Sequence, residues 1–271
     1  MDGLLITILI VTGFLVYKMI SSSRKQEGYK RWKATGSGDT ANEETAGNKW
    51  KHGAWLRHAL GVTTPKARTY PVFDEEAVVW CAGLLGVEAV RLKEILQDVS
   101  SHYREFWIRK RKGGYRMISA PDKELKSIQD TIYHRILLPV NVHPVATGFR
   151  RQHSIVDNVR PHLGKRCVLK TDIHDFFLSI RSPRVKQTFE NIGYPKNISK
   201  VLGELCCRRR HLPQGASTSP ALSNIIAYEM DRKLAAMAEE FGLAYTRYAD
   251  DLTFSGDVFP KEQVLVRVKE K

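Results

Sequence analysis

Two acidic residues occupy the turn of an apolar hairpin near the C-terminal end of the sequence. Residues 244–248 and 252–255 both have the composition of strands, and Asp250 and Asp251 fall in the tight turn between them. Turns favour aspartate, so a lone Asp-Asp pair is most simply a turn filler. The pair therefore predicts a hairpin and does not by itself predict a function.

A third carboxylate has the same setting. Asp172 lies near the end of a short strand predicted over 167–173, just before the aromatic pair Phe176 and Phe177. Carboxylates that lie close together raise each other's pKa unless cations neutralise them. Oxygen-only ligands suit Mg²⁺, which takes one or two carboxylates plus substrate phosphates, and two such ions support phosphoryl transfer. The pattern suggests a magnesium site, which spacing alone does not establish.

These acids stand out because the rest of the chain is basic. The 271 residues carry a formal net charge of +14, the pI is near 9.7, and 42% of the residues are hydrophobic. This composition excludes a wholly disordered polyelectrolyte, predicts one or two domains, and favours a polyanionic partner, either nucleic acid or an anionic membrane face. The four cysteines form no C-x-x-C pair, which disfavours a zinc or disulfide framework and fits a reducing compartment.

The first apolar segment, residues 4–20, predicts a membrane anchor. As a helix it would span about 25 Å, near the lower limit for a hydrocarbon core. A cleaved signal peptide and a buried core helix are the alternatives, but no basic residue precedes the run and a polar stretch follows it. Six basic residues come at its end or soon after it, so we expect a single-pass cell-membrane protein with its N-terminus outside and its catalytic region in the cytoplasm. They are Lys18, Arg24, Lys25, Lys30, Arg31 and Lys33.

Helices and antiparallel strands alternate along the remaining sequence without βαβ regularity or internal repeats, which predicts the α+β class. Asp74 is the expected N-cap of one helix, and residues 87–99 form a second. Residues 103–119 read as a hairpin that turns at Gly113 and Gly114. Two more helices are expected, one with apolar residues at 125, 128, 132 and 136 and one that begins at Ser219.

Several long motifs give the sequence a family resemblance. The segments TDIHDFF (171–177), LPQGASTSPALSN (212–224) and RYADDLTFSG (247–256) resemble the three central palm motifs of reverse transcriptases, in the same order and spacing. Upstream, GGYRMISAPDKELKSIQDTIYHRILLP (113–139) resembles the fingers motifs of the bacterial branch, and ATGFRRQHSIVDNVRPH (146–162) the neighbouring region of retron-type enzymes. Agreement of several independent motifs is much more specific than any one of them.

The resemblance implies a right-hand polymerase with fingers and palm, an antiparallel palm sheet and packed helices, preceded by one transmembrane helix. We expect a transmembrane helix over 1–22, a flexible linker over 23–52, an N-terminal helical region over 53–100, and fingers and palm over 101–271. The family continues past the acidic hairpin into a primer grip and a thumb, which are absent before Lys271. The sequence is a fragment, or the product is naturally short, or a partner protein supplies the missing elements.

The implied activity is that of a retron-type RNA-directed DNA polymerase. Two Mg²⁺ ions, with Mn²⁺ as a substitute, would support addition of deoxynucleotides to a DNA primer on an RNA template. The template could be a cognate structured RNA, and the resemblance implies a role in antiphage defence. The alternative is a membrane-anchored module that resembles a reverse transcriptase and binds RNA without productive polymerisation. A basic scaffold on a membrane surface leaves the positions of the three aspartates unexplained.

Roles carry over to individual positions. By resemblance, Asp172 and Asp250 hold the ions and Asp251 supports them, Asp175 lies nearer the triphosphate, and the ring of Phe177 excludes a ribose 2′-hydroxyl. The other substrate-binding positions are Arg116, Lys110, Gln214 and Gly215. The nucleic-acid-binding positions are Arg208, Arg209, Arg210, Ser219, Asn158 and His162. Residues 158–162 resemble the Asn-Ala-x-x-His signature of retron enzymes, with Val159 in place of alanine, and His162 taken alone would be structural.

Overall fold

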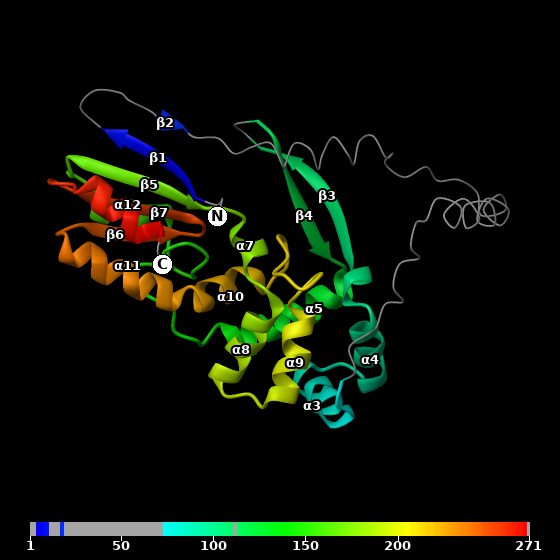
Figure 1. Ribbon diagram of the computed structural model, residues 1–271. Helices are drawn as coiled ribbons and strands as arrows, with labels where there is room; N and C mark the ends of the chain where they lie inside the picture. Colours follow the sequence, from blue (N-terminus) through cyan, green and yellow to red (C-terminus); the bar gives the residue numbers. More distant parts are fainter. Residues whose placement is uncertain (1–3, 11–16, 19–72, 111–112, 270–271) are drawn as a thin grey trace, which may run out of the picture. The chain divides into compact units, whose positions relative to one another are not determined.

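A computed structural model of the chain describes residues 4–10, 17–18, 73–110 and 113–269 (Figure 1). The chain divides into two compact units. The larger comprises Met1–Ser21, Phe73–Ile108 and Met117–Lys271, and the described part of the smaller is the hairpin tip within Arg109–Arg116. Helices and antiparallel strands alternate along the chain, so the predicted α+β class is confirmed.

The elements follow one another in this order. The strands are β1 (Leu4–Ile10), β2 (Tyr17–Lys18), β3 (Tyr103–Arg109), β4 (Tyr115–Pro121), β5 (Cys167–Ile173), β6 (Ala244–Tyr248) and β7 (Asp251–Gly256). The longer helices are α3 (Glu75–Leu85), α4 (Ala89–Gln97), α5 (Lys123–Ile132), α8 (Ser182–Ile192), α9 (Lys196–Leu205), α10 (Ser219–Ile226), α11 (Tyr228–Glu240) and α12 (Lys261–Lys269). Short helical turns are η2 (Val99–His102), η3 (Tyr133–Leu137), α6 (Ile155–Val159), η4 (Arg160–His162) and α7 (Phe176–Ser179).

The larger unit contains a fully antiparallel sheet with the strand order β2-β1-β5-β7-β6. Leu169, Phe254 and Tyr245 are register partners across β5, β7 and β6, and the rings of Tyr245 and Phe254 stack at 4.6 Å between centroids. Buried side chains of α11 and α12 join these residues in one cluster, and Figure 1 shows both helices beside β6 and β7. Because side chains alternate along a strand, the next residue of each strand faces the other side of the sheet.

The remaining helices pack around a second apolar cluster, to which α3, α4, α5, α8, α9 and α10 all contribute. Their ends follow the expected chemistry. The Asp74 side chain caps α3 by accepting a hydrogen bond from the Glu76 amide, as the sequence predicts, and Asp122 caps α5 through the Leu125 amide. Burial raises the pKa of the Cys81 and Cys206 thiols to about 12, so both pack as neutral apolar groups.

The structure does not contain the helix predicted over residues 4–20. Leu4–Ile10 form β1, which pairs with β5 and places the backbone of Leu5 opposite Asp172. No helix within the described ranges combines the length and the apolar character that a bilayer crossing requires. A continuous apolar run is compatible with a buried strand as well as with a helix, which is why the prediction went wrong. The predicted linker, 23–52, lies outside the described residues.

Candidate active site

The two palm strands bring the predicted metal-binding acids together. Asp172 and Asp251 are direct partners in the pairing of β5 with β7, so their side chains leave the same face of the sheet. The Asp250 carbonyl accepts a hydrogen bond of 2.8 Å from the Ile173 amide, which fixes the turn against the end of β5. Ala249 opens this turn with a φ of 59°, a left-handed conformation that costs a non-glycine residue free energy. The fold therefore places all three acids at the same end of the sheet.

Lys170 accompanies these acids, and sequence reasoning missed it. It lies two residues before Asp172 on β5, and its ammonium donates a 2.8 Å hydrogen bond to Oδ2 of Asp251. The two side chains are 48% and 39% exposed, so the ion pair lies at the surface of the site. The period of two along a strand would have placed Lys170 on the face of the acids. Its ammonium compensates the negative charge of Asp251 where a divalent cation would otherwise do so.

We compared this arrangement with what Mg²⁺ requires. Within the described residues, no three acidic, histidine or cysteine side chains converge on one metal position. The donors still fit the ion, because Asp172, Asp250 and Asp251 supply only oxygen and two of them are cross-strand neighbours. A cation at Asp251 would have to displace Lys170, whereas Asp172 and Asp250 are the positions at which the resemblance places the principal ligands.

The predicted gate residue packs against a second ring. The centroid of Phe177 lies 5.9 Å from that of Phe149 and 5.7 Å from that of Phe176. Asp175 precedes these rings with a φ of 50°, and its carboxylate lies 3.4 Å from Nδ1 of His174. Phe149 is also left-handed, with a φ of 61°. Non-glycine residues in this conformation concentrate at functional sites, so this aromatic cluster deserves the role that the sequence assigns to Phe177.

The Gln214 and Gly215 loop lies on β4. The Gln214 carbonyl accepts a hydrogen bond of 2.8 Å from the Ser119 amide. Gly215 has a φ of 129°, and a Cβ at this position would come within 2.9 Å of both the Ile118 side chain and the Ser119 carbonyl oxygen. The sequence predicts a close backbone approach at Gly215, and β4 is the backbone that it approaches in this structure.

Three predicted nucleic-acid contacts are instead internal. Ser219 is 1% exposed and begins α10 below the surface. Asn158 is buried, and its side-chain oxygen accepts a hydrogen bond of 2.9 Å from the Thr147 hydroxyl. His162 places Nε2 2.7 Å from the Thr246 hydroxyl and Nδ1 2.6 Å from the Ser255 hydroxyl. These residues hold the segment 146–162 on β6 and β7, which corrects their prediction as RNA contacts.

The hydrogen bonds around His162 define its protonation state. The Thr246 hydroxyl donates to the Asn158 carbonyl, so it accepts from Nε2 of His162, and Nδ1 is left to accept from Ser255. Burial lowers the pKa of His162, which also favours the neutral ring. The ring is therefore a structural clamp across the acidic hairpin.

This clamp predicts a dependence of stability on pH. The unfolded chain, with a histidine pKa near 6.5, takes up a proton more readily than the folded chain. The stabilising contribution of His162 is therefore complete above about pH 7 and is lost as the pH falls through the lowered folded pKa. We expect the urea midpoint of the His162→Gln variant to fall less than that of the wild type between pH 7.5 and pH 5.5. Equal declines in the two proteins would contradict this role.

The arginine run before the Gln214 loop divides into two parts. Arg208 and His211 pair across a two-residue turn, in which Arg209 and Arg210 have φ values of 47° and 68°. The Arg208 side chain is 8% exposed, pairs with Glu105 of β3 and lies over the ring of Tyr103. Arg208 therefore stabilises the fold, which corrects its prediction as a nucleic-acid contact, whereas Arg209 and Arg210 are exposed at the turn.

The two remaining cations belong to the hairpin tip. Arg116 is exposed on β4, and Lys110 follows β3. The Lys110 amide donates to the Gly114 carbonyl, and Gly113 and Gly114 both have positive φ values, so the predicted turn is confirmed. The position of this unit relative to the three aspartates is not defined, and the triphosphate contacts of Arg116 and Lys110 stay predictions.

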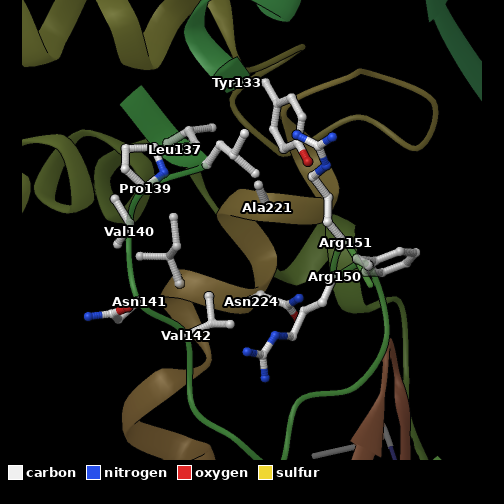
Figure 2. Close-up of a pocket in the computed structure, with 13 residues that line it drawn as sticks. Tyr133, Leu137, Pro139, Val140, Asn141, Val142, Arg150, Arg151, Ala221 and Asn224 are labelled. Atoms are coloured by element: carbon white, nitrogen blue, oxygen red, sulfur yellow. The ribbon is translucent and has the colours of Figure 1, made fainter. Parts of the chain in front are cut away.

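A cavity of about 230 Å³ opens beside α10. In Figure 2, Leu137, Pro139 and Val140 lie along one side of it, and Arg150 and Arg151 lie on the other. Arg150 is anchored by a hydrogen bond of 3.3 Å from Nη1 to the Ala146 carbonyl. An apolar wall opposite guanidinium groups can accept a flat, negatively charged group such as a nucleotide.

Comparison with known proteins identifies the family. The model for "Reverse transcriptase (RNA-dependent DNA polymerase)" matches residues 108–269. The retron Ec86 reverse transcriptase of Escherichia coli is 37% identical over 179 residues, which cover 65% of this chain and 55% of the relative. The retron Mx162 reverse transcriptase of Myxococcus xanthus is 32% identical over 255 residues, which cover 85% and 52%.

Among solved structures, a Candida albicans telomerase in complex with a TWJ fragment of telomeric RNA is similar with a TM-score of 0.41. Its sequence identity is 12%, and the match covers 62% of this chain and 39% of the telomerase. The chain spans about half the length of the curated relatives that it matches. The motifs, the strands that carry them and the family match agree, and the chain belongs to the reverse transcriptase family, with relatives of the retron type.

Proposed function

We propose that this chain is the fingers and palm of a retron-type RNA-directed DNA polymerase. The observation that carries the proposal is the pairing of Asp172 with Asp251 beside the turn that contains Asp250, within a sequence that belongs to the reverse transcriptase family. The net charge of +14 supports a nucleic-acid partner, because phosphate contacts dominate such binding.

In the proposed reaction, the primer 3′ oxygen forms a bond to the α-phosphorus of a deoxynucleoside triphosphate, and pyrophosphate leaves. Asp172 and Asp250 would hold two Mg²⁺ ions, which supply stabilisation of the charge on the attacking and leaving oxygens. Lys170 compensates the negative charge of Asp251 at the same face. Exposed Arg209 and Arg210 would contact the phosphodiester backbone and so position the duplex without reading its sequence.

The proposal is tested by primer extension with the 271-residue chain. A labelled DNA primer on an RNA template is incubated with deoxynucleoside triphosphates and Mg²⁺, and we expect extension products that are absent for Asp172→Asn and after chelation of the metal. Binding in a gel-shift assay without extension would overturn the proposal. It would favour the second candidate, an RNA-binding module without polymerisation, which the coverage of only half of each relative also makes reasonable.

The gate proposed at Phe177 makes a separate prediction. Removing the ring in Phe177→Ala takes away the steric clash with a ribose 2′-hydroxyl, so the preference for deoxynucleotides over ribonucleotides should fall by about tenfold to a hundredfold, the range for changes in pocket shape. The measurement is the ratio of kcat/KM for the two nucleotides. The control, Trp80→Ala, removes a half-exposed ring from α3 and should leave the ratio unchanged. An unaltered ratio in Phe177→Ala would refute the gate.

The biological setting is also a proposal. A structured RNA as template and a role in antiphage defence rest on the resemblance to retron enzymes. Attachment to a membrane through residues 4–20, with the catalytic region in the cytoplasm, stays a prediction from apolar composition and flanking charge. The pairing of Leu4–Ile10 with β5 is an alternative use of the same residues, and fractionation of cells that express the chain distinguishes the two.

A further inference from the structure

Arg247 is the largest side chain that the described part of the molecule buries completely. It lies on β6, three residues before Asp250, and every nitrogen of its guanidinium has a partner. Nε and Nη2 donate to the two carboxylate oxygens of Asp231 at 2.8 and 2.6 Å. Nη1 donates to Asn224 Oδ1 at 3.0 Å and to the Ala249 carbonyl at 2.9 Å. Burial of an ion pair is rarely a gain over apolar packing, so such a network indicates a demand for a specific geometry.

The contact with Ala249 connects this network to the acidic turn. Ala249 is the left-handed residue that immediately precedes Asp250, and its carbonyl belongs to the peptide that joins the two. A hydrogen bond from a buried, fixed guanidinium therefore sets the plane of that peptide. The orientation of this plane in turn determines the direction in which the Asp250 side chain leaves the backbone.

A second contact holds the turn from the other side. A Cβ on Gly148 would come within 2.6 Å of the Ala249 amide nitrogen, so the Gly148 backbone presses directly against the turn. Asn224 positions this backbone by donating a hydrogen bond of 2.8 Å to the Gly148 carbonyl. The same Asn224 side chain accepts from Arg247, so a single amide connects the two supports of the turn.

The other end of the network lies on the helices. Asn224 belongs to α10 and Asp231 to α11, and the Tyr245 hydroxyl donates a further hydrogen bond of 3.0 Å to Asp231. The Arg247 guanidinium also lies over the ring of Phe176, at 5.7 Å from its centroid, next to the predicted gate. The acidic turn is thus held in register with both helices and with the gate.

We infer that Arg247, held by Asp231 and Asn224, is a positioning residue that fixes the peptide before Asp250 so that this carboxylate is oriented for a divalent cation. The inference rests on the proposed function, because it assumes that Asp250 binds the metal. Arg247 does not contact substrate or metal and acts only through the turn. Loss of an outer partner of a metal ligand typically weakens metal binding by 10–100-fold, and this is the size of effect that the inference predicts.

The test measures Mn²⁺ binding by electron paramagnetic resonance titration, alongside the melting temperature. Arg247→Lys keeps a positive charge for Asp231 but loses the planar fork that also reaches Asn224 and Ala249. Asn224→Ala leaves the ion pair intact and removes the link to Gly148, so it serves if Arg247→Lys does not fold. We expect the Kd for Mn²⁺ to rise by about tenfold or more in either folded variant.

The matched control is Gln129→Leu. Gln129 is also completely buried, and its amide donates to the Tyr103 hydroxyl and the Leu205 carbonyl in the helical cluster, away from the sheet. This variant should melt at a lower temperature with its Mn²⁺ affinity unchanged. Wild-type affinity in the folded Arg247→Lys or Asn224→Ala variant, or an equal loss in Gln129→Leu, would overturn the inference. If the wild type binds no Mn²⁺ that Asp250→Asn removes, the proposed function fails and the inference fails with it.

Discussion

Replacing Asp250 with asparagine is expected to reduce Mg²⁺-dependent primer extension by at least about a thousandfold, which corresponds to roughly 4 kcal/mol of lost transition-state stabilisation. The substitution keeps the size of the side chain and removes the negative charge that a divalent cation requires. The melting temperature should change little, because the Asp250 contact that the structure shows in the turn is made by its backbone carbonyl.

Asp257→Asn provides the matched control for this experiment. Asp257 follows β7 directly, and its carboxylate lies 3.5 Å from the Lys165 ammonium at the other end of the strand. The same chemical change at this exposed position should leave extension unaltered. Retention of wild-type extension by Asp250→Asn, or a comparable loss in Asp257→Asn, would remove Asp250 from the proposed reaction.

The second large effect is expected on stability. Asp231→Ala leaves the Arg247 guanidinium as an unpaired charge in the interior, and the free energy of unfolding should fall by about 3–5 kcal/mol. Both partners are fully buried, and the pair is bidentate. Urea denaturation of the two proteins measures the difference.

An exposed ion pair on the same helix serves as the comparison. Arg232 and Glu229 also make two hydrogen bonds, at 2.9 and 2.6 Å, but each side chain is 56% exposed. Glu229→Ala should cost about 1 kcal/mol or less, because solvent screens the pair. Similar losses in the two variants would show that burial does not govern the strength of these pairs.

The local elements could be predicted from the sequence because their signals are local. The strand over 167–173, the hairpin with Gly113 and Gly114 at its turn, and the helix capped by Asp74 all agree with the structure. The helix expected from Ser219 onward is present as two, α10 and α11, which meet at Ala227. Helices α8 and α9 were not predicted, although Pro183 in the first turn and Gly193 at the end of α8 are recognisable boundary signals.

The candidate site was predictable only in part, because its motifs name residues and not their partners. The sequence placed the three aspartates near one another, and the register of β5 and β7 agrees. It did not show that Arg247 would meet Asp231 of a distant helix, or that His162 would bond across β6 and β7. A side chain's polar partners are set by long-range packing, so a motif at Asn158 and His162 cannot reveal whether they face RNA or the sheet.

The tight turn at Arg209 and Arg210 limits how this protein could be engineered. Both residues have the left-handed backbone that asparagine and glycine adopt more easily in a two-residue hairpin. A designer who introduced Asn-Gly there would relax the loop and strip two guanidinium groups from its tip. Thermal robustness and electrostatic reach are therefore opposed at this one dipeptide.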